Sequence, residues 1–276
     1  MENNEVAIVT GASSGIGYAI SLALSKAGIR VAVGARRTDR LQELEKQIIK
    51  NNDGGGETFI QKKLDVTSKS DCDSFVDAIV GKWGKVDILI NNAGLMPLSY
   101  FKNGKVEEWE RMIDVNIKGV LYCTSAVIPH MLDKKSGHIV NISSVAGRIV
   151  FAGGSVYCAT KHAITAFSEG LRKELSPQYN IRVTCIEPGA VSTELLETIT
   201  DESMEGHIQA TKNMETLQSE DIAKAVLYAI CNTSTKSCEC QRDIDKAHSP
   251  RKVITNSPII TSIDGSIEMV SPRGSL

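Results

Sequence analysis

Short apolar runs alternate with longer stretches of helical period from Val6 to about Pro188. The runs are rich in β-branched residues and bounded by turn residues, which indicates buried strands. The clearest predicted strands are Val6–Val9, Val31–Val33, Val86–Ile90, His138–Ile142 and Ile181–Ile186, with a weaker candidate at Phe59–Leu64.

Apolar residues recur at three- and four-residue spacing between these strands, which predicts helices. The expected helices are Gly17–Lys26, Arg40–Lys50, Lys69–Gly81, Val106–Leu132, Ser155–Leu175 and Ser219–Ile230. Strand followed by helix, repeated, favours the α/β class with one parallel sheet covered on both faces and right-handed crossovers.

The chain shows no internal repeat and no linker rich in Pro, Gly and Ser, so we expect a single domain over residues 1–230. After about Cys231 the pattern fades into polar sequence, and only Val253–Ile263 suggests a strand. Residues 231–276 are interpreted as a divergent C-terminal segment. Either a divergent last strand with a disordered end or a replaced C-terminus fits this segment.

Charge is nearly balanced: 31 basic residues face 33 acidic ones, for a formal net charge of -2 over 276 residues. This balance argues against nucleic-acid or anionic-lipid partners. The acidic, polar start lacks the features of a secretory signal, and no apolar run reaches the length of a membrane span, so we expect a cytoplasmic protein. Cys238 and Cys240 form a C-x-C pair without nearby ligands, so we expect no metal.

The first predicted strand runs directly into a glycine-rich turn at which the helical pattern begins. A strand-to-helix turn aims free N–H groups and the positive end of the helix dipole at an anion, and glycine lets a pyrophosphate approach. Taken alone, the glycines are also compatible with a simple tight turn. The candidate phosphate-binding residues are Gly11, Ser13, Ser14, Gly15, Ile16 and Gly17.

Arg36 and Arg37 follow the second predicted strand, where a fold that prefers NAD carries an acidic residue. Adjacent guanidinium groups bind a 2′-phosphate through forked, charge-assisted hydrogen bonds. The sequence therefore favours NADP(H) over NAD(H). The alternative is that both arginines are solvated residues at a helix start.

Tyr157 and Lys161 lie four residues apart on one face of a predicted helix. A free tyrosine has a pKa near ~10, and a nearby ammonium together with an oxidised nicotinamide favours its phenolate. Lowering that pKa by about three units requires about 4 kcal/mol of differential interaction. The preceding strand ends at Ser143 and Ser144, which places hydroxyls at the ligand-binding edge of the sheet.

These motifs together resemble the short-chain dehydrogenase/reductase family over approximately Val6 to Thr193. They are Thr10-Gly11-x-x-x-Gly15-Ile16-Gly17, Asn91-Asn92-Ala93-Gly94, Ser144 and Tyr157-x-x-x-Lys161, in that order. The resemblance implies a single Rossmann-type, doubly wound parallel sheet of order 3-2-1-4-5-6-7, although the chain has no clear match to the seventh strand. It also implies a homodimer or homotetramer.

By this resemblance Tyr157 is the general acid/base, and Lys161 holds the ribose hydroxyls and depresses the tyrosine pKa. Ser144 orients the substrate oxygen, with Ser143 as the neighbouring alternative. Asn116 completes a tetrad, its main chain holding a water in the proton relay to Lys161.

The resemblance also assigns further residues to the cofactor. Asp65 with Val66 faces the adenine, Asn92, Ala93 and Gly94 line the adenosine side, and Pro188, Gly189, Val191 and Thr193 contact the nicotinamide carboxamide. Each motif has a structural alternative: a helix cap for Asp65, a turn for Asn91-Asn92, and a strand terminator for Pro188-Gly189.

The sequence thus predicts an NADP(H)-dependent oxidoreductase that moves a hydride between the nicotinamide and a carbonyl or secondary alcohol of a small substrate. Substrates in view are hydroxy acids and general carbonyl compounds, selected by Leu95–Phe101, Val145–Gly154 and the stretch from Thr193 to about Ser219. Within that stretch, Thr193–Met214 suits either a lid helix or a solvated helical face. The alternative function is a non-catalytic NADP-binding regulatory protein, which normally loses the tyrosine or the lysine.

Overall fold

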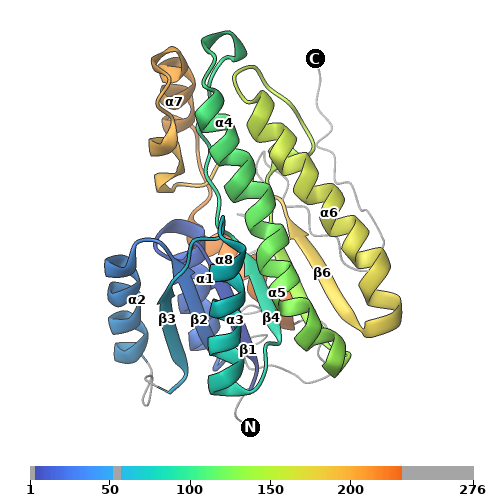
Figure 1. The fold of residues 1–276 in the computed structure, drawn as a ribbon. Helices are drawn as coiled ribbons and strands as arrows, with labels where there is room; N and C mark the ends of the chain where they lie inside the picture. Colours follow the sequence, from blue (N-terminus) through green and yellow to red (C-terminus); the bar gives the residue numbers. More distant parts are fainter. Residues whose placement is uncertain (1–3, 52–56, 232–276) are drawn as a thin grey trace.

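The computed structural model describes residues 4–51 and 57–231. The expected strand Val253–Ile263, the Cys238/Cys240 pair and the rest of the C-terminal segment lie outside these residues. Figure 1 shows one twisted sheet with helices packed on both of its faces.

Six parallel strands form the sheet in the order β3-β2-β1-β4-β5-β6 among the described residues. This confirms the predicted fold class and the first six positions of the predicted order. The strands are β1 (Val6–Thr10), β2 (Arg30–Ala35), β3 (Phe59–Lys63), β4 (Ile88–Asn91), β5 (Gly137–Ile142) and β6 (Ile181–Ile186).

Alternate residues of the central strands feed two separate hydrophobic cores. Ala7 and Val9 of β1 pack with α1, α2 and α8, whereas Val6 and Ile8 pack on the opposite face with α3 and α5. Both faces are apolar because helices cover both, which explains why β1 is buried along its whole length. The helices are α1 (Gly15–Lys26), α2 (Thr38–Asn51), α3 (Lys69–Trp83), α4 (Val106–Ile113), α5 (Gly119–Lys134), α6 (Ser155–Tyr179), α7 (Glu205–Lys212) and α8 (Ser219–Cys231).

The predicted continuous helix Val106–Leu132 is wrong in one detail. A π-turn, η2 (Asp114–Lys118), separates α4 from α5, although Figure 1 shows the two running on as one long rod. The Asn116 amide lies inside this turn and bonds to the backbone of Leu95 in both directions, at 2.9 and 3.0 Å. Such π-bulges inside α-helices are frequent at functional sites.

The chain between β6 and α8 crosses the carboxyl-end edge of the sheet. It forms two short 3₁₀ turns, η4 (Glu194–Thr198) and η5 (Glu202–Met204), and then α7. Both interpretations of Thr193–Met214, a lid helix and a solvated helical face, expect a helix, and the structure has one short helix preceded by two 3₁₀ turns. Polar contacts fasten this segment to the loop after β4: Met96 N donates to Thr198 Oγ1 at 3.1 Å, and Asn103 Nδ2 donates to Asp201 Oδ2 at 2.7 Å.

None of the helices in the described part of the chain has both the length and the apolar character to cross a membrane.

Gly34 allows β2 to pack against α3. A Cβ built on Gly34 would lie 2.6 Å from Leu64 Cδ2, 2.8 Å from Leu64 Cβ and 3.1 Å from Phe75 Cζ, all within the core. We therefore expect Gly34→Ala to lower the free energy of unfolding by about 1–3 kcal/mol through overpacking. Urea denaturation followed by circular dichroism measures this change.

Gly81 in α3 is the matched control, because a Cβ there would meet no atom within 4 Å. Gly81→Ala should leave stability unchanged or raise it by up to about 1 kcal/mol, as expected for a helical glycine. Equal effects of the two substitutions would contradict the packing argument.

Candidate active site

The turn after β1 touches the end of β4 with almost no space between them. Gly11 has a φ of 67°, and a Cβ on it would lie 2.7 Å from Ala93 Cα. A Cβ on Gly17 would lie 2.4 Å from Asn92 Nδ2. Glycine is therefore required at both positions, by backbone conformation at the first and by close packing at both.

Thr10 binds the two segments together. Its Oγ1 accepts hydrogen bonds from the backbone N–H groups of Asn92 and Ala93, each at 3.1 Å, while Asn92 Nδ2 donates to Thr10 O at 3.0 Å. Asn91 instead points within the sheet and donates to Asn141 Oδ1 at 2.8 Å. Asn91 thus ends β4, and the segment that Asn92 begins makes one wall of the site.

The N-terminus of α1 suits an anion. Ser14 is the N-cap residue, its side chain makes no capping hydrogen bond, and the first turn carries no acidic residue. The first N–H groups of a helix have no intrahelical partners, and the helix dipole adds positive potential there. Together with the space left by the missing Cβ atoms, this turn fits the pyrophosphate of a dinucleotide.

Arg37 lies over the same turn. Its Nε donates to Ser13 Oγ at 3.2 Å, its second terminal nitrogen, Nη2, donates to Ser14 Oγ at 2.7 Å, and Nη1 forms an ion pair with Glu194 at 2.8 Å. Arg36 is exposed at the adjacent position, and its positive charge lowers the pKa of Asp65.

Asp65 does not cap α3, because Ser68 does so by accepting from Asp71 N. Its Oδ1 instead accepts from Thr67 N at 3.0 Å and from Thr67 Oγ1 at 2.8 Å. Partial burial raises the pKa of Asp65, but these hydrogen bonds and the charges of Arg36 and Lys63 outweigh it and hold that pKa below its usual value. The next residue, Val66, packs against the start of α5 at Gly119, where a Cβ would approach it to 2.8 Å.

Tyr157 and Lys161 meet in the first turns of α6, as the four-residue spacing predicts. Lys161 Nζ lies 5.8 Å from the centroid of the Tyr157 ring, and both residues are buried, with 9% and 5% of their surfaces exposed. Nζ also donates to Ile142 O at 3.0 Å, at the end of β5. The phenol ring and the amine therefore face each other at the carboxyl edge of the sheet.

Burial dominates the acid–base properties of this pair. It raises the pKa of Tyr157 to about 12, although a hydrogen bond with Ser144 acts in the opposite direction. It also lowers the pKa of Lys161 to about 8. Without nucleotide, desolvation of the phenolate thus dominates the tyrosine pKa. The lowering of that pKa by Lys161 together with an oxidised nicotinamide stays a prediction.

The two serines after β5 have separate surroundings. Ser143 Oγ donates to Lys161 O at 3.0 Å and forms a hydrogen bond with Thr165 Oγ1 at 3.2 Å. Its hydroxyl is therefore engaged in hydrogen bonds to α6. Ser144 Oγ donates to Pro188 O at 3.3 Å and shares a hydrogen bond with the Tyr157 hydroxyl. Of the two, Ser144 is the serine beside the phenol.

Asn116 comes to this group from the π-turn. Besides its bonds to Leu95, its Nδ2 donates to Thr160 Oγ1 at 3.2 Å. A Cβ on Gly94 would lie 3.4 Å from Asn116 Oδ1 and 3.9 Å from Lys161 Nζ, so these three residues converge. The structure thus brings Asn116 together with the tyrosine, serine and lysine expected from the sequence.

The segment after β6 closes the other side. Pro188 O accepts from Val145 N at 2.9 Å, which fixes the turn after β5 to the turn after β6. Gly189 follows Pro188 directly, and Val191 then pairs with Leu217 in an isolated parallel bridge. Thr193 caps η4 by accepting from Leu195 N at 3.3 Å.

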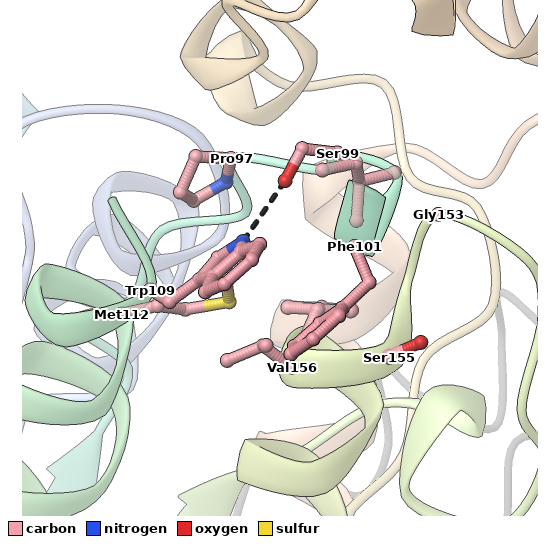
Figure 2. A pocket seen from close by; sticks show the side chains of 10 residues that line it. Pro97, Ser99, Phe101, Trp109, Met112, Gly153, Ser155 and Val156 are labelled. Atoms are coloured by element: carbon pink, nitrogen blue, oxygen red, sulfur yellow. Dashed lines mark hydrogen bonds between the residues drawn. The ribbon is translucent and has the colours of Figure 1, made fainter. Parts of the chain in front are cut away.

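A small pocket lies beside Tyr157, between the loop after β4, α4 and the start of α6 (Figure 2). Trp109 donates from its ring nitrogen to Ser99 Oγ at 2.9 Å, the bond drawn in Figure 2, so the one hydroxyl on that wall already has a donor. None of the lining residues is charged: Pro97, Leu98, Ser99, Phe101, Trp109, Met112, Gly153, Ser155, Val156 and Tyr157. The lining is therefore uncharged, with hydroxyl groups on Ser99, Ser155 and Tyr157.

Sequence reasoning missed several participants. Glu194 forms an ion pair with Arg37, which lies 157 positions earlier in the sequence. Met204 packs in the same cluster as Tyr157, although 47 positions separate them in the sequence. Only the Thr193-Glu194 start of a helical turn gave any local signal, as an N-cap followed by a carboxylate.

Across residues 4–51 and 57–231 no group of three or more His, Cys, Asp or Glu side chains is arranged to hold a metal ion.

Comparison with known proteins gives the chain a family. The family model described as short chain dehydrogenase matches residues 5–204. An uncharacterized oxidoreductase of Staphylococcus saprophyticus is 45% identical over 229 residues, which cover 82% of this chain and 90% of that protein.

Solved structures of similar sequence support the same family. The closed form of a serine dehydrogenase complexed with NADP+ is 36% identical, with a TM-score of 0.73 over 83% of this chain and 89% of that one. A 3-ketoacyl-(acyl-carrier-protein) reductase from Brucella melitensis complexed with NADH is 30% identical, with a TM-score of 0.71 over 81% of this chain and 89% of that one. With the sheet order and the converging motifs, these matches show that the chain is an oxidoreductase belonging to the short-chain dehydrogenase/reductase family.

Proposed function

We propose that this protein is an NADP(H)-dependent oxidoreductase that interconverts a carbonyl group and a secondary alcohol on a small substrate. The observation that supports this most strongly is the meeting of the Tyr157 phenol, the Ser144 hydroxyl and the Lys161 amine. They lie at the same edge of the sheet as the N-terminus of α1, whose cap residue makes no capping hydrogen bond. Bound there, a nicotinamide dinucleotide would supply or accept the hydride.

Tyr157 is the proposed general acid/base. Its neutral phenol, favoured by burial, donates a proton to the substrate oxygen as negative charge develops there during reduction. Ser144 donates a second hydrogen bond to the same oxygen, which lowers the free energy of the developing charge. In alcohol oxidation Tyr157 takes the proton back.

Lys161 and Asn116 position these groups. The Lys161 amine, held by Ile142 O, lies close enough to the phenol to stabilise its anion and has two remaining hydrogens for ribose hydroxyls. Asn116 fixes the segment after β4 through Leu95 and bonds to α6 through Thr160. Its Oδ1 also lies close to Gly94. We propose that its main chain completes the proton path.

The proposed cofactor contacts follow the edge of the sheet. The turn at Gly11–Gly17 takes the pyrophosphate, Asp65 and Val66 with Asn92–Gly94 take the adenosine, and the Pro188–Thr193 turn takes the carboxamide. Arg37, held over the turn, is proposed to bind the 2′-phosphate of NADP(H), with Arg36 contributing charge. The relative complexed with NADP+ supports this choice, and the relative complexed with NADH makes it the point to be tested.

Tyr157→Phe tests the acid/base role directly. With NADPH and a panel of small aldehydes, ketones and 3-hydroxy acids, we expect kcat to fall by about 10²–10⁴-fold because the proton donor is lost. Cofactor binding, followed by nicotinamide fluorescence, should remain. Tyr228→Phe, on the exposed part of α8, is the matched control and should retain activity. Tight NADPH binding without turnover in the unmodified protein would instead favour a regulatory protein.

The raised pKa of Tyr157 predicts where its phenol ionises. A folded-state pKa above the ordinary 10.0 means that the neutral form is favoured, so ionisation moves to higher pH. In the protein without nucleotide, ultraviolet difference titration of the unmodified protein against Tyr157→Phe should show no extra tyrosinate below about pH 10. Adding NADP+ should shift the difference signal to lower pH, because a positive charge favours the phenolate. A tyrosinate difference between pH 7 and 9 without nucleotide would contradict this account.

Arg37→Ala tests the cofactor preference. Loss of charge-assisted hydrogen bonds worth about 1.5–3 kcal/mol should lower kcat/KM for NADPH by about 10- to 100-fold, with little change for NADH. Arg30→Ala, which removes the same charge at the opposite end of β2, should change neither. An equal loss of kcat/KM with NADPH and NADH would show that Arg37 does not bind the 2′-phosphate.

A further inference from the structure

Arg37 joins two segments that are far apart in the sequence. On one side it donates to the hydroxyls of Ser13 and Ser14, and on the other it forms a 2.8 Å ion pair with Glu194. Three of its five N–H groups are therefore engaged by groups of this chain. A proposed phosphate ligand has to share this guanidinium with a resident carboxylate.

The position of Glu194 is fixed by its surroundings. It opens η4 directly after the N-cap Thr193. Thr193 Cγ2 lies only 3.1 Å from the point where a Cβ on Gly15 would stand, so the start of η4 lies against the phosphate turn. The hydrogen bond from Arg37, together with one from Ser14 and the charge of Arg40, holds the pKa of Glu194 below its usual value. The carboxylate is thus charged at neutral pH.

NADP(H) and NAD(H) would interact differently with the Arg37 guanidinium. NADP(H) carries a 2′-phosphate, an anion that prefers the same guanidinium as a carboxylate does. Two anions on one cation repel each other, so one interaction weakens the other. NAD(H) carries no phosphate there and leaves the Arg37–Glu194 pair undisturbed.

Resting on the proposed NADP(H) function, we propose that Glu194 is a specificity-determining residue. It competes with the 2′-phosphate of NADP(H) for Arg37 and so limits how strongly the enzyme distinguishes NADP(H) from NAD(H). The residue acts through Arg37 and not on the reacting atoms.

The size of the effect follows from the exposure of the pair. Arg37 and Glu194 expose 47% and 37% of their side chains, and ion pairs this exposed are weak. We expect Glu194→Gln to strengthen NADPH binding by about two- to five-fold and to leave NADH binding unchanged. The gain should shrink at high ionic strength because the charges are screened.

Glu197 provides the matched control. It lies one turn along in η4, is exposed, and Glu197→Gln removes the same charge. Dissociation constants for NADPH and NADH are measured by nicotinamide fluorescence for the unmodified protein, both glutamine variants, Arg37→Ala and the Arg37→Ala/Glu194→Gln double variant. The ratio of the two constants is the readout, because a merely structural role of Glu194 would change both cofactors alike.

The expected result is a higher NADPH preference in Glu194→Gln, none in Glu197→Gln, and no further change when Arg37 is already alanine. A lower NADPH preference in Glu194→Gln, an equal change for both cofactors, or the same gain in the Arg37→Ala background would overturn the competition. If Arg37→Ala leaves the ratio unchanged, the proposed NADP(H) contact itself fails, and the competition fails with it. The two failures are thus distinguishable.

Discussion

The close contact between the turn after β1 and the end of β4 is the constraint on which the site depends. Because Gly11 and Gly17 have no side chains, Asn92 and Ala93 can lie directly against them. The Thr10 hydroxyl holds the turn after β1 to the end of β4 by accepting hydrogen bonds from the backbone of Asn92 and Ala93. Strand order reverses direction at β1 and β4, and such a switch point opens the crevice where ligands bind in parallel sheets. The glycines therefore set both the packing of the sheet edge and the shape of the crevice.

Desolvation controls the chemistry that this crevice can perform. Tyr157 and Lys161 are both removed from water, and burial moves their pKa values apart from each other in the direction of the neutral forms. A buried pair in this state needs an additional charge before the phenol can ionise near neutral pH. In the proposed reaction the charge of the bound cofactor would therefore lower the pKa of Tyr157. The protein itself holds the reacting groups in position and excludes water from them.

Much of the fold could be predicted because strands buried on both faces give an unmistakable pattern, as in Val6–Thr10. The site motifs could be predicted for a similar reason: glycine at close contacts and a tyrosine four residues before a lysine are local features. Contacts between distant segments could not be predicted. The Arg37–Glu194 pair and the packing of Met204 with Tyr157 depend on how the chain after β6 crosses the sheet edge. The π-turn at Asn116 was not predicted, and the Leu95 backbone to which its side chain bonds lies 21 positions away in the sequence.

The π-turn changes how the side chains of α4 are oriented around the helix axis relative to those of α5. Its hydrogen bonds span five residues instead of four, so it accommodates an extra residue, and each residue of an α-helix advances about 100° around the axis. The faces that α4 and α5 bury are thus offset from those of an uninterrupted helix. Deleting one residue between Asp114 and Lys118 would restore the regular helical spacing and rotate α4 against α5 about the helix axis. The extra residue therefore acts as a rotational spacer, and the length of this segment is constrained even where the identity of its residues is not.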